Sequence, residues 1–494
     1  MANNRYLWWT GLISGPLSAL LLIGPVELGG AGPQVMAMAG IATWMSIWWI
    51  MEIIPLGATA LLPLILFPLL GIMDGNSTAG AYINYVIFLF LGGFLIALAM
   101  ERWELHRRIA LRTLLMFGSE LHRLVFSFML ASAFLSMWIS NTATAVMMLP
   151  IGLAVLKNFD RRMDDEVAKR FSVVLLLGIA YGCSVGGVAT LVGTPPNLAF
   201  VRIYEINMPE ALPVTFGQWM LLGLPLTVIM LGITWGVLTK LKIPDLAGYR
   251  VDRSVIREEY RSLGPMSREE KVVLAVFAAT ALLWVFRADL RLGVLTIPGW
   301  SNLLPYPGMI DDGTVAIAMA LLLFVIPAKN GNHDFLLEAH IFREVPWGII
   351  LLFGGGFALA EGFLESGLSE YIGQQFKALS GVPVLGLTGM ICASVTFLTE
   401  LTSNTATAQT ILPIVASVAN AIGVHPLLLM VPATLSASFA FMMPVATPPN
   451  AILFGSDRIP IMEMVKTGLI LNLIGIVVVT FVSYFLISFI FGIS

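Results

Sequence analysis

Apolar stretches long enough to cross a membrane recur along the whole chain, and short polar segments separate them. Clear examples lie near residues 6–26, 34–54, 214–239 and 467–492. A helix of about 20 apolar residues spans the hydrocarbon core of a bilayer, which is about 30 Å thick. The pattern therefore predicts an all-α polytopic membrane protein with about 11 transmembrane segments.

Internal repetition gives the organisation of these segments. Three short motifs occur twice in the same order: GGF at 92–94 and 355–357, SNTATA at 140–145 and 403–408, and TPPN at 194–197 and 447–450. Self-similarity in a fixed order is the signature of a duplicated unit. The sequence thus predicts two related halves.

The distribution of Lys and Arg changes how one apolar stretch is interpreted. Basic residues gather in segments 101–123, 157–170 and 240–271, and such segments belong on the cytoplasmic side of a membrane. The apolar stretch 124–156 lies between two of them, so both of its ends should face the cytoplasm. At 1.5 Å per helical residue it is too long for one crossing. We interpret it as a re-entrant helical hairpin with SNT at its tip, and the repeat places a second hairpin at about 382–421.

Prolines predict a second irregular element in each half. The TPPN motifs lie inside long apolar stretches at about 171–201 and 425–455. Consecutive prolines remove two backbone donors and clash with the preceding turn, so each of these helices should break at the motif. Discontinuous helices at corresponding positions of two halves indicate a transporter site near the middle of the membrane.

An odd number of crossings in each half makes the two halves inverted relative to each other. The expected parts are an extra N-terminal helix (1–30), a first inverted repeat (31–240), a cytoplasmic linker (241–269) and a second inverted repeat (270–494). The N-terminus is then cytoplasmic and the C-terminus external.

The predicted site contains almost no charge. Stretches 124–156, 171–201 and 425–455 contain no Asp, Glu, Lys or Arg, and 382–421 contains only Glu400. Helix N-termini after SNT and TPPN favour an anion, and freed carbonyls with Ser, Thr and Asn oxygens favour a monovalent cation such as sodium. Glu400 is an ionisable residue in a neutral hairpin; it either tunes the second cation site or pairs elsewhere, and we leave it out of the predicted site.

A hydroxyl residue lies four positions before each SNT serine, namely Ser136 and Thr399. This spacing is one helical turn, so each hydroxyl can join the oxygens of its hairpin tip. Neither Ser140 nor Ser403 has a His or Asp close by in the sequence, which speaks against an intramembrane hydrolase, and no phosphate-binding loop motif indicates ATP-driven transport. We therefore do not expect an enzyme. Hairpins that open on opposite sides favour alternating access over an open channel.

These motifs resemble those of the divalent anion/sodium symporter family, which carries di- and tricarboxylates or sulfate. The paired SNT motifs, each followed by TPPN, are similar to that family's signature, and so is IMEIIPLGATALLPLILFPLLGIM at 50–73. The resemblance covers essentially the whole chain. It implies a homodimer in a bacterial cytoplasmic membrane, in which a transport domain moves past a scaffold in elevator fashion.

The resemblance also implies specific site residues. The residues expected to bind the anion are Ser140, Asn141, Thr142, Thr194, Pro195, Ser403, Asn404, Thr405, Thr447 and Pro448. The residues expected around one sodium ion are Ser136, Ser140, Asn141 and Gly193. Those expected around another are Thr399, Thr402, Asn404 and Ala446, with Thr402 and Ala446 acting through their carbonyls.

We accordingly expect sodium-coupled symport of a C4-dicarboxylate such as succinate, malate or fumarate. The alternatives are a sodium-independent dicarboxylate exchanger and a sodium-coupled citrate or sulfate transporter. Sodium-independent members of the family carry basic side chains where the cations would bind, whereas this chain has neutral oxygen ligands there. The expected partners are the small anion, sodium ions, lipid and a second copy of the chain, with no nucleic acid.

Overall fold

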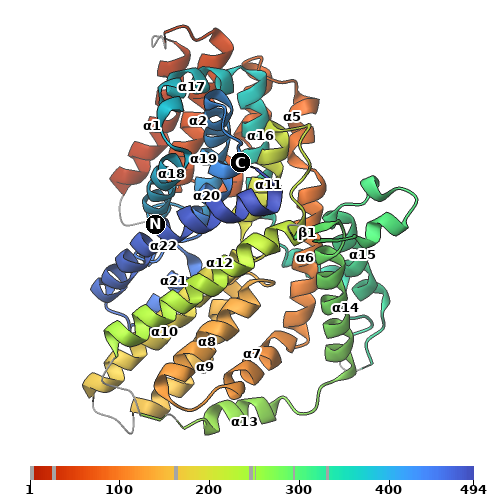
Figure 1. Ribbon diagram of the computed structural model, residues 1–494, viewed down its shortest axis with the longest axis vertical. Coiled ribbons are helices and arrows are strands. Elements are labelled where there is room, and N and C mark those ends of the chain that lie inside the picture. Colours follow the sequence, from red (N-terminus) through yellow and green to blue (C-terminus); the bar gives the residue numbers. More distant parts are fainter. Residues whose placement is uncertain are drawn as a thin grey trace.

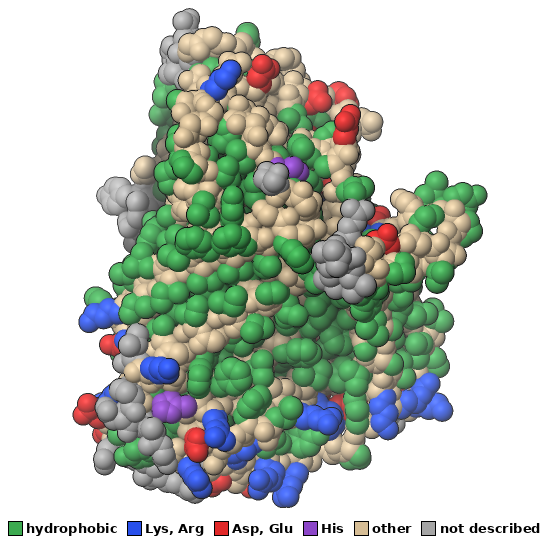
Figure 2. Space-filling model, in the orientation of Figure 1, with side chains coloured by type: hydrophobic (Ala, Val, Ile, Leu, Met, Phe, Trp, Pro, Cys, Tyr) green, Lys and Arg blue, Asp and Glu red, His purple; other side chains and the backbone are tan. Residues whose placement is uncertain are grey.

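The computed structural model is almost entirely helical and describes residues 5–24, 29–160, 165–243, 249–250, 252–292, 295–329 and 333–493. Helices α1, α2, α17 and α18 lie towards one end of the long axis, and α13 lies at the other end (Figure 1). Lys and Arg side chains gather at the end occupied by α13, while hydrophobic side chains cover much of the middle (Figure 2).

The first half of the described chain contains twelve helices and a terminal turn. They are α1 (Arg5–Ile23), α2 (Pro33–Met51), α3 (Leu56–Thr59), α4 (Leu62–Leu69), α5 (Gly75–Tyr82), α6 (Tyr85–Arg102), α7 (Leu105–Met116), α8 (Leu121–Ser136), α9 (Asn141–Asp160), α10 (Asp165–Gly187), α11 (Pro195–Asn207), α12 (Phe216–Gly236) and the π-helical turn Val237–Leu241. Helix α12 begins with a capping box, in which Thr215 and Gln218 each satisfy the backbone N–H of the other.

The second half adds ten helices and a small hairpin. They are α13 (Ser254–Ser262), α14 (Arg268–Val285), strands β1 (Leu290–Leu292) and β2 (Leu295–Ile297), α15 (Asp312–Val325), α16 (Trp347–Glu365), α17 (Leu368–Phe376), α18 (Val384–Thr399), α19 (Asn404–Ile422), α20 (Leu427–Ala437), α21 (Pro448–Phe454), α22 (Ile461–Phe491) and the 3-10 turns Trp300–Leu303, Pro307–Met309, Ala339–Arg343 and Lys377–Gly381. The two strands are antiparallel, with Leu290 opposite Ile297.

Eight helical segments among the described residues are long and apolar enough to cross a membrane. They are Pro33–Met51, Gly75–Arg102, Asn141–Asp160, Asp165–Gly187, Phe216–Lys240, Trp347–Glu365, Asn404–Ile422 and Ile461–Phe491. Six further apolar helical segments are shorter; they include Leu121–Ser136 and Val384–Thr399, which precede the two SNT motifs. The helical, membrane-type architecture expected from the hydrophobic pattern is therefore present.

Two segments differ from the sequence interpretation. The apolar stretch 57–73 is long enough for one helix but forms the two short helices α3 and α4, because Pro63 in the first turn of α4 has no backbone N–H with which to continue a helix from α3. The segment 241–269, predicted to be a cytoplasmic linker, contains α13, whose Ile256 is buried. Helix α13 lies against α7, so this part of the segment packs onto the helices.

Buried apolar side chains form two clusters. The larger cluster extends through α6, α8–α12 and α18–α22, and the smaller one gathers residues of α2, α4 and α16 around Trp49 and Phe67. The cavity described below lies where residues of α6 and α16 face the ends of α9, α11, α19 and α21.

Candidate functional site

Each SNT motif lies at the turn between two helices. Helix α8 ends at Ser136 and α9 begins at Asn141, so Ser140 directly precedes the new helix. In the second half α18 ends at Thr399, and Ser403 is the N-cap of α19. Ser140 Oγ accepts a hydrogen bond from the Ala143 N–H at 3.2 Å. Each motif therefore puts hydroxyl and amide groups beside the positive end of a helix.

Each TPPN motif begins a short helix after a non-helical segment. We call the segments 188–194 and 438–447 the first and second break. Thr194 and Thr447 are the N-caps of α11 and α21, and the prolines occupy the first turn, where a missing N–H costs no helical hydrogen bond. Thr447 Oγ1 accepts from the Asn450 N–H at 3.3 Å. The breaks thus leave backbone groups free for other partners.

The asparagine that ends each TPPN motif ties its break to the helix. Asn197 Nδ2 donates to the Thr190 carbonyl at 2.7 Å, and Asn450 Nδ2 donates to the carbonyls of Ala440 and Met443, both at 3.1 Å. Both side chains are fully buried. Sequence reasoning found the motif through its prolines and assigned no role to these amides, although their repetition in both halves was a usable signal.

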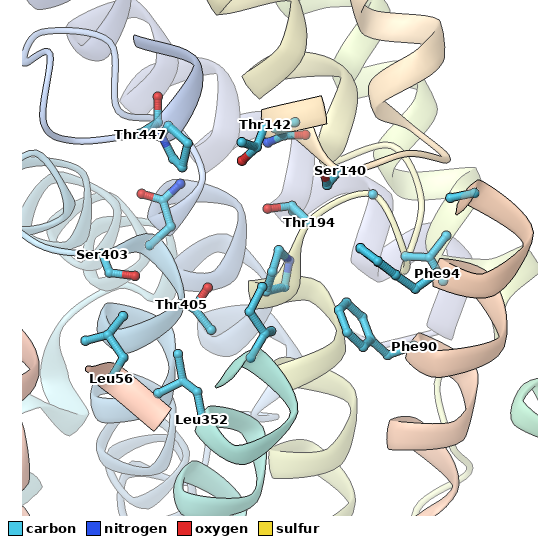
Figure 3. Close-up of a pocket in the computed structure, with 18 of the residues that line it drawn as sticks. Leu56, Phe90, Phe94, Ser140, Thr142, Thr194, Leu352, Ser403, Thr405 and Thr447 are labelled. Carbon is cyan, nitrogen blue, oxygen red and sulfur yellow. The ribbon is translucent and has the colours of Figure 1, made fainter. Parts of the chain in front are cut away.

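All ten residues predicted to bind the anion line one cavity of about 420 Å³. They are Ser140, Asn141, Thr142, Thr194, Pro195, Ser403, Asn404, Thr405, Thr447 and Pro448. Figure 3 shows the labelled Ser and Thr side chains of both halves around a common space, with Phe90 and Phe94 on one side and Leu56 and Leu352 on another. A volume of this size is within the range of small-ligand pockets, about 300–1,000 Å³.

The residues predicted for the cations lie partly in this cavity and partly behind it. Gly193 and Ala446 line the cavity together with Ser140, Asn141 and Asn404. The remaining three, Ser136, Thr399 and Thr402, do not line it; they are buried, with 0%, 0% and 6% of their surface exposed.

Two of these buried hydroxyls touch the asparagine of the neighbouring SNT motif. Ser136 Oγ donates to Asn141 Oδ1, and Thr399 Oγ1 lies 2.8 Å from Asn404 Oδ1 and 2.9 Å from the Ala437 carbonyl oxygen. One hydroxyl proton cannot be donated fully to both acceptors. The group of oxygens around Thr399 and Asn404, which we call the second cation cluster, therefore has more oxygens than protons to bridge them. The Thr402 hydroxyl bonds instead with the Leu398 carbonyl and the Thr407 hydroxyl.

Around Ser136 and Asn141, which we call the first cation cluster, two glycines lie very close to oxygen atoms. A Cβ atom on Gly187 would lie 2.6 Å from Asn141 Oδ1. A Cβ atom on Gly193 would lie 2.5 Å from the Gly187 carbonyl oxygen and 3.0 Å from that of Ser136. A side chain at position 193 would therefore displace backbone oxygens, whereas one at position 187 would displace the amide of Asn141.

The walls of the cavity are mostly apolar, and sequence reasoning did not identify them. Phe90, Gly93 and Phe94 of α6 contribute, as does Trp138 within the first hairpin. The repeated GGF motif contained a signal for Gly93 and Phe94 that was not assigned a function. Glu52, directly after α2, is the one residue with an ionisable side chain among those that line the cavity in the described chain. Neutral oxygens and helix ends, with this single carboxylate, thus determine the electrostatics of the cavity.

Comparison with known proteins gives concordant results at the level of sequence and fold. The family described as sodium:sulfate symporter transmembrane region matches residues 9–491. The chain is 42% identical over 493 residues to the sodium-dependent dicarboxylate transporter SdcS of Staphylococcus saprophyticus and equally to that of Staphylococcus aureus, covering 98% of this chain and 92% of each relative.

Two solved structures share the fold at low sequence identity. They are the YdaH transporter of Alcanivorax borkumensis (15% identity, TM-score 0.59, 98% of both chains) and MtrF of Neisseria gonorrhoeae (13% identity, TM-score 0.55, 97% of this chain and 98% of the other). At this identity the likeness is one of fold.

Proposed function

The chain belongs to the sodium:sulfate symporter family of divalent anion/sodium symporters, and from this premise we propose that it is a secondary transporter that couples sodium to the movement of a C4-dicarboxylate. The single observation that carries the proposal is the convergence of both SNT motifs and both TPPN motifs on one cavity of about 420 Å³. The relatives named sodium-dependent dicarboxylate transporter support the same solute and ion.

Helix ends and amides bind the anion in this proposal. Helices α9, α11 and α19 begin at Asn141, Pro195 and Asn404, which line the cavity. First-turn N–H groups of α9 and α19, and the positive dipole ends of all three helices, stabilise carboxylates without a basic side chain, whereas the two prolines that begin α11 donate no N–H. Hydroxyls of Thr142 and Thr405 add donors, and the apolar walls exclude water and strengthen these interactions.

Two asparagines couple the anion to the cations. Asn141 and Asn404 line the cavity, while the Oδ1 atom of each contacts the buried hydroxyl behind it, Ser136 or Thr399. A sodium ion at either oxygen cluster holds the amide oxygen, which directs the NH₂ group towards the cavity as a donor for the carboxylate. The anion therefore binds weakly until the cations have fixed both amides.

Orientation and motion complete the proposal. The end of the molecule that is rich in Lys and Arg (Figure 2) faces the cytoplasm. The distribution of Lys and Arg along the sequence supports a cytoplasmic N-terminus and an external C-terminus. The protein resides in the cytoplasmic membrane as a homodimer. The two halves form inverted repeats, and the hairpins and broken helices carry the site across as an elevator domain.

Transport by purified protein in liposomes tests the proposal. Labelled succinate, malate, fumarate, citrate and sulfate are offered with an inward gradient of sodium, potassium or choline. We expect C4-dicarboxylates to accumulate only with the sodium gradient, and protein-free liposomes give the background. Equal uptake in potassium or choline would refute sodium coupling and favour the exchanger, whereas preferential uptake of sulfate or citrate would refute the C4 assignment.

A further inference from the structure

Glu400 is a buried carboxylate for which the proposed anion and cation sites leave no role. It follows α18 directly, next to Thr399, and only 3% of its surface is exposed. It is the only Asp, Glu, Lys or Arg in the segment 382–421. Burial of a charge in an apolar hairpin is costly unless several donors compensate it, so the contacts of this side chain require an explanation.

The carboxylate of Glu400 binds three consecutive backbone N–H groups of the second break. Oε1 accepts from the N–H of Phe441 at 2.7 Å and of Met442 at 2.9 Å, and Oε2 accepts from that of Met443 at 2.9 Å. Oε1 also accepts from Asn472 Nδ2 of α22 at 2.7 Å. Both oxygens only accept, so the arrangement is that of an ionised carboxylate fixed by charge-assisted hydrogen bonds.

These contacts continue to the residues proposed for the second cation. Met443, whose N–H is held by Glu400, accepts hydrogen bonds at its carbonyl from the Ala446 N–H at 3.2 Å and from Asn450 Nδ2 at 3.1 Å. On the other side of Glu400, the Thr399 hydroxyl lies 2.8 Å from Asn404 Oδ1. Glu400 thus connects the two groups of ligands, one on the hairpin and one on the break.

The first half of the chain closes its break without a charge. Met137 is the repeat counterpart of Glu400, at the offset of 263 that relates the SNT motifs. Its carbonyl accepts from Thr190 Oγ1, and the same hydroxyl accepts from the Gly193 N–H at 3.1 Å. A neutral hydroxyl therefore does in the first half what a carboxylate does in the second, and the negative charge distinguishes the second cation cluster.

We propose that Glu400 is a positioning residue for the second cation site. Its carboxylate fixes the second break against the hairpin, so that the Ala446 carbonyl and the oxygens of Thr399 and Asn404 face one point. Its buried charge also raises the affinity of that point for a cation, because unit charges interact strongly in a medium of low dielectric constant. The inference rests on the proposed sodium coupling and adds a residue that specifically controls the second cation.

The test compares Glu400→Gln and Glu400→Asp with the matched control Tyr181→Phe. Tyr181 donates to the Phe441 carbonyl at 2.8 Å, so the control removes one hydrogen bond from the same break without touching the carboxylate. Initial uptake of labelled succinate in liposomes is measured as a function of sodium and, at saturating sodium, as a function of succinate. Thermal stabilisation of the purified protein by added sodium gives a second readout that needs no transport.

We expect Glu400→Gln to raise the half-saturating sodium concentration by about tenfold or more and to lower the Hill coefficient for sodium. The KM for succinate at saturating sodium stays near that of the unmodified protein. Glu400→Asp keeps the charge on a shorter side chain, so its half-saturating sodium concentration should lie between those of the unmodified protein and Glu400→Gln. Tyr181→Phe should keep the original sodium dependence.

Three results would overturn the inference. These are an unchanged sodium dependence in folded Glu400→Gln, an equal shift in Tyr181→Phe, and a loss confined to the succinate KM. If Glu400→Gln does not fold, Glu400→Asp decides the matter, and an unchanged sodium response in that variant also overturns the inference. Failure of the proposed function is distinguishable, because the unmodified protein would then show no sodium dependence at all.

Discussion

Gly193→Ala provides a sharp test of the first cation cluster. The added Cβ atom would lie 2.5 Å from the Gly187 carbonyl oxygen, whereas ordinary C···O contacts lie at about 3.3–3.6 Å. The two atoms must therefore separate by roughly 0.8 Å, although the Gly187 carbonyl is fixed at the buried end of α10 and Gly193 lies in the first break. The added Cβ atom would also lie 3.0 Å from the Ser136 carbonyl oxygen, so residue 193 cannot move away from Gly187 in that direction.

A displacement of this size exceeds the tolerance of a preorganised site, which is about 0.5 Å. Misplacement by about 1 Å typically costs two orders of magnitude. We therefore expect the half-saturating sodium concentration of Gly193→Ala to rise about 100-fold, equivalent to about 2.8 kcal/mol. The assay is the initial rate of labelled succinate uptake in liposomes over a range of sodium concentrations.

Two controls separate this effect from a general response to glycine substitution. Gly232→Ala on α12 adds a Cβ atom with nothing within 4 Å, so sodium dependence should not change. Ala446, which precedes Thr447 as Gly193 precedes Thr194, already carries a Cβ atom, so Ala446→Gly should have a mild effect. A Gly193→Ala protein that is folded and has a sodium dependence within about twofold of the original would refute the reasoning.

The remaining predictions concern the amides of the site and one buried ion pair. Asn141→Ala and Asn404→Ala should each abolish uptake while the protein elutes as a folded species, because each removes the group shared by anion and cation; normal uptake excludes that residue from the site. Asn450→Ala removes the donor of the Ala440 carbonyl and one of the two donors of the Met443 carbonyl, which should cost about 1–3 kcal/mol and lower the melting temperature. Glu270→Ala removes the carboxylate that binds the buried Arg108 guanidinium at 2.8 and 3.1 Å. The guanidinium keeps the carbonyls of Leu263 and Gly264 but has no counter-charge. The expected loss is about 3–5 kcal/mol in thermal or denaturant unfolding; an unchanged midpoint in either of the last two variants contradicts its premise.

Several features followed from local sequence alone. Helix α9 begins at Asn141 and α19 at Asn404, at the two SNT motifs, and α11 and α21 begin at the prolines of TPPN. Hydrophobic length, proline and capping residues act within one helical turn, so they can be interpreted without knowledge of the fold. The family followed from the same motifs, and its match over residues 9–491 confirms that identification.

Other features depended on packing between distant parts of the chain. Nothing local to Phe90 or Leu352 indicates that each faces the SNT residues across one cavity. The sequence singled out Glu400 as unusual, but its donors lie more than 40 residues away, at Phe441 and beyond. Local chemistry determined which groups this protein presents at helix ends and breaks. Only the tertiary structure decided which of those groups meet, because contacts between distant segments depend on how whole helices pack.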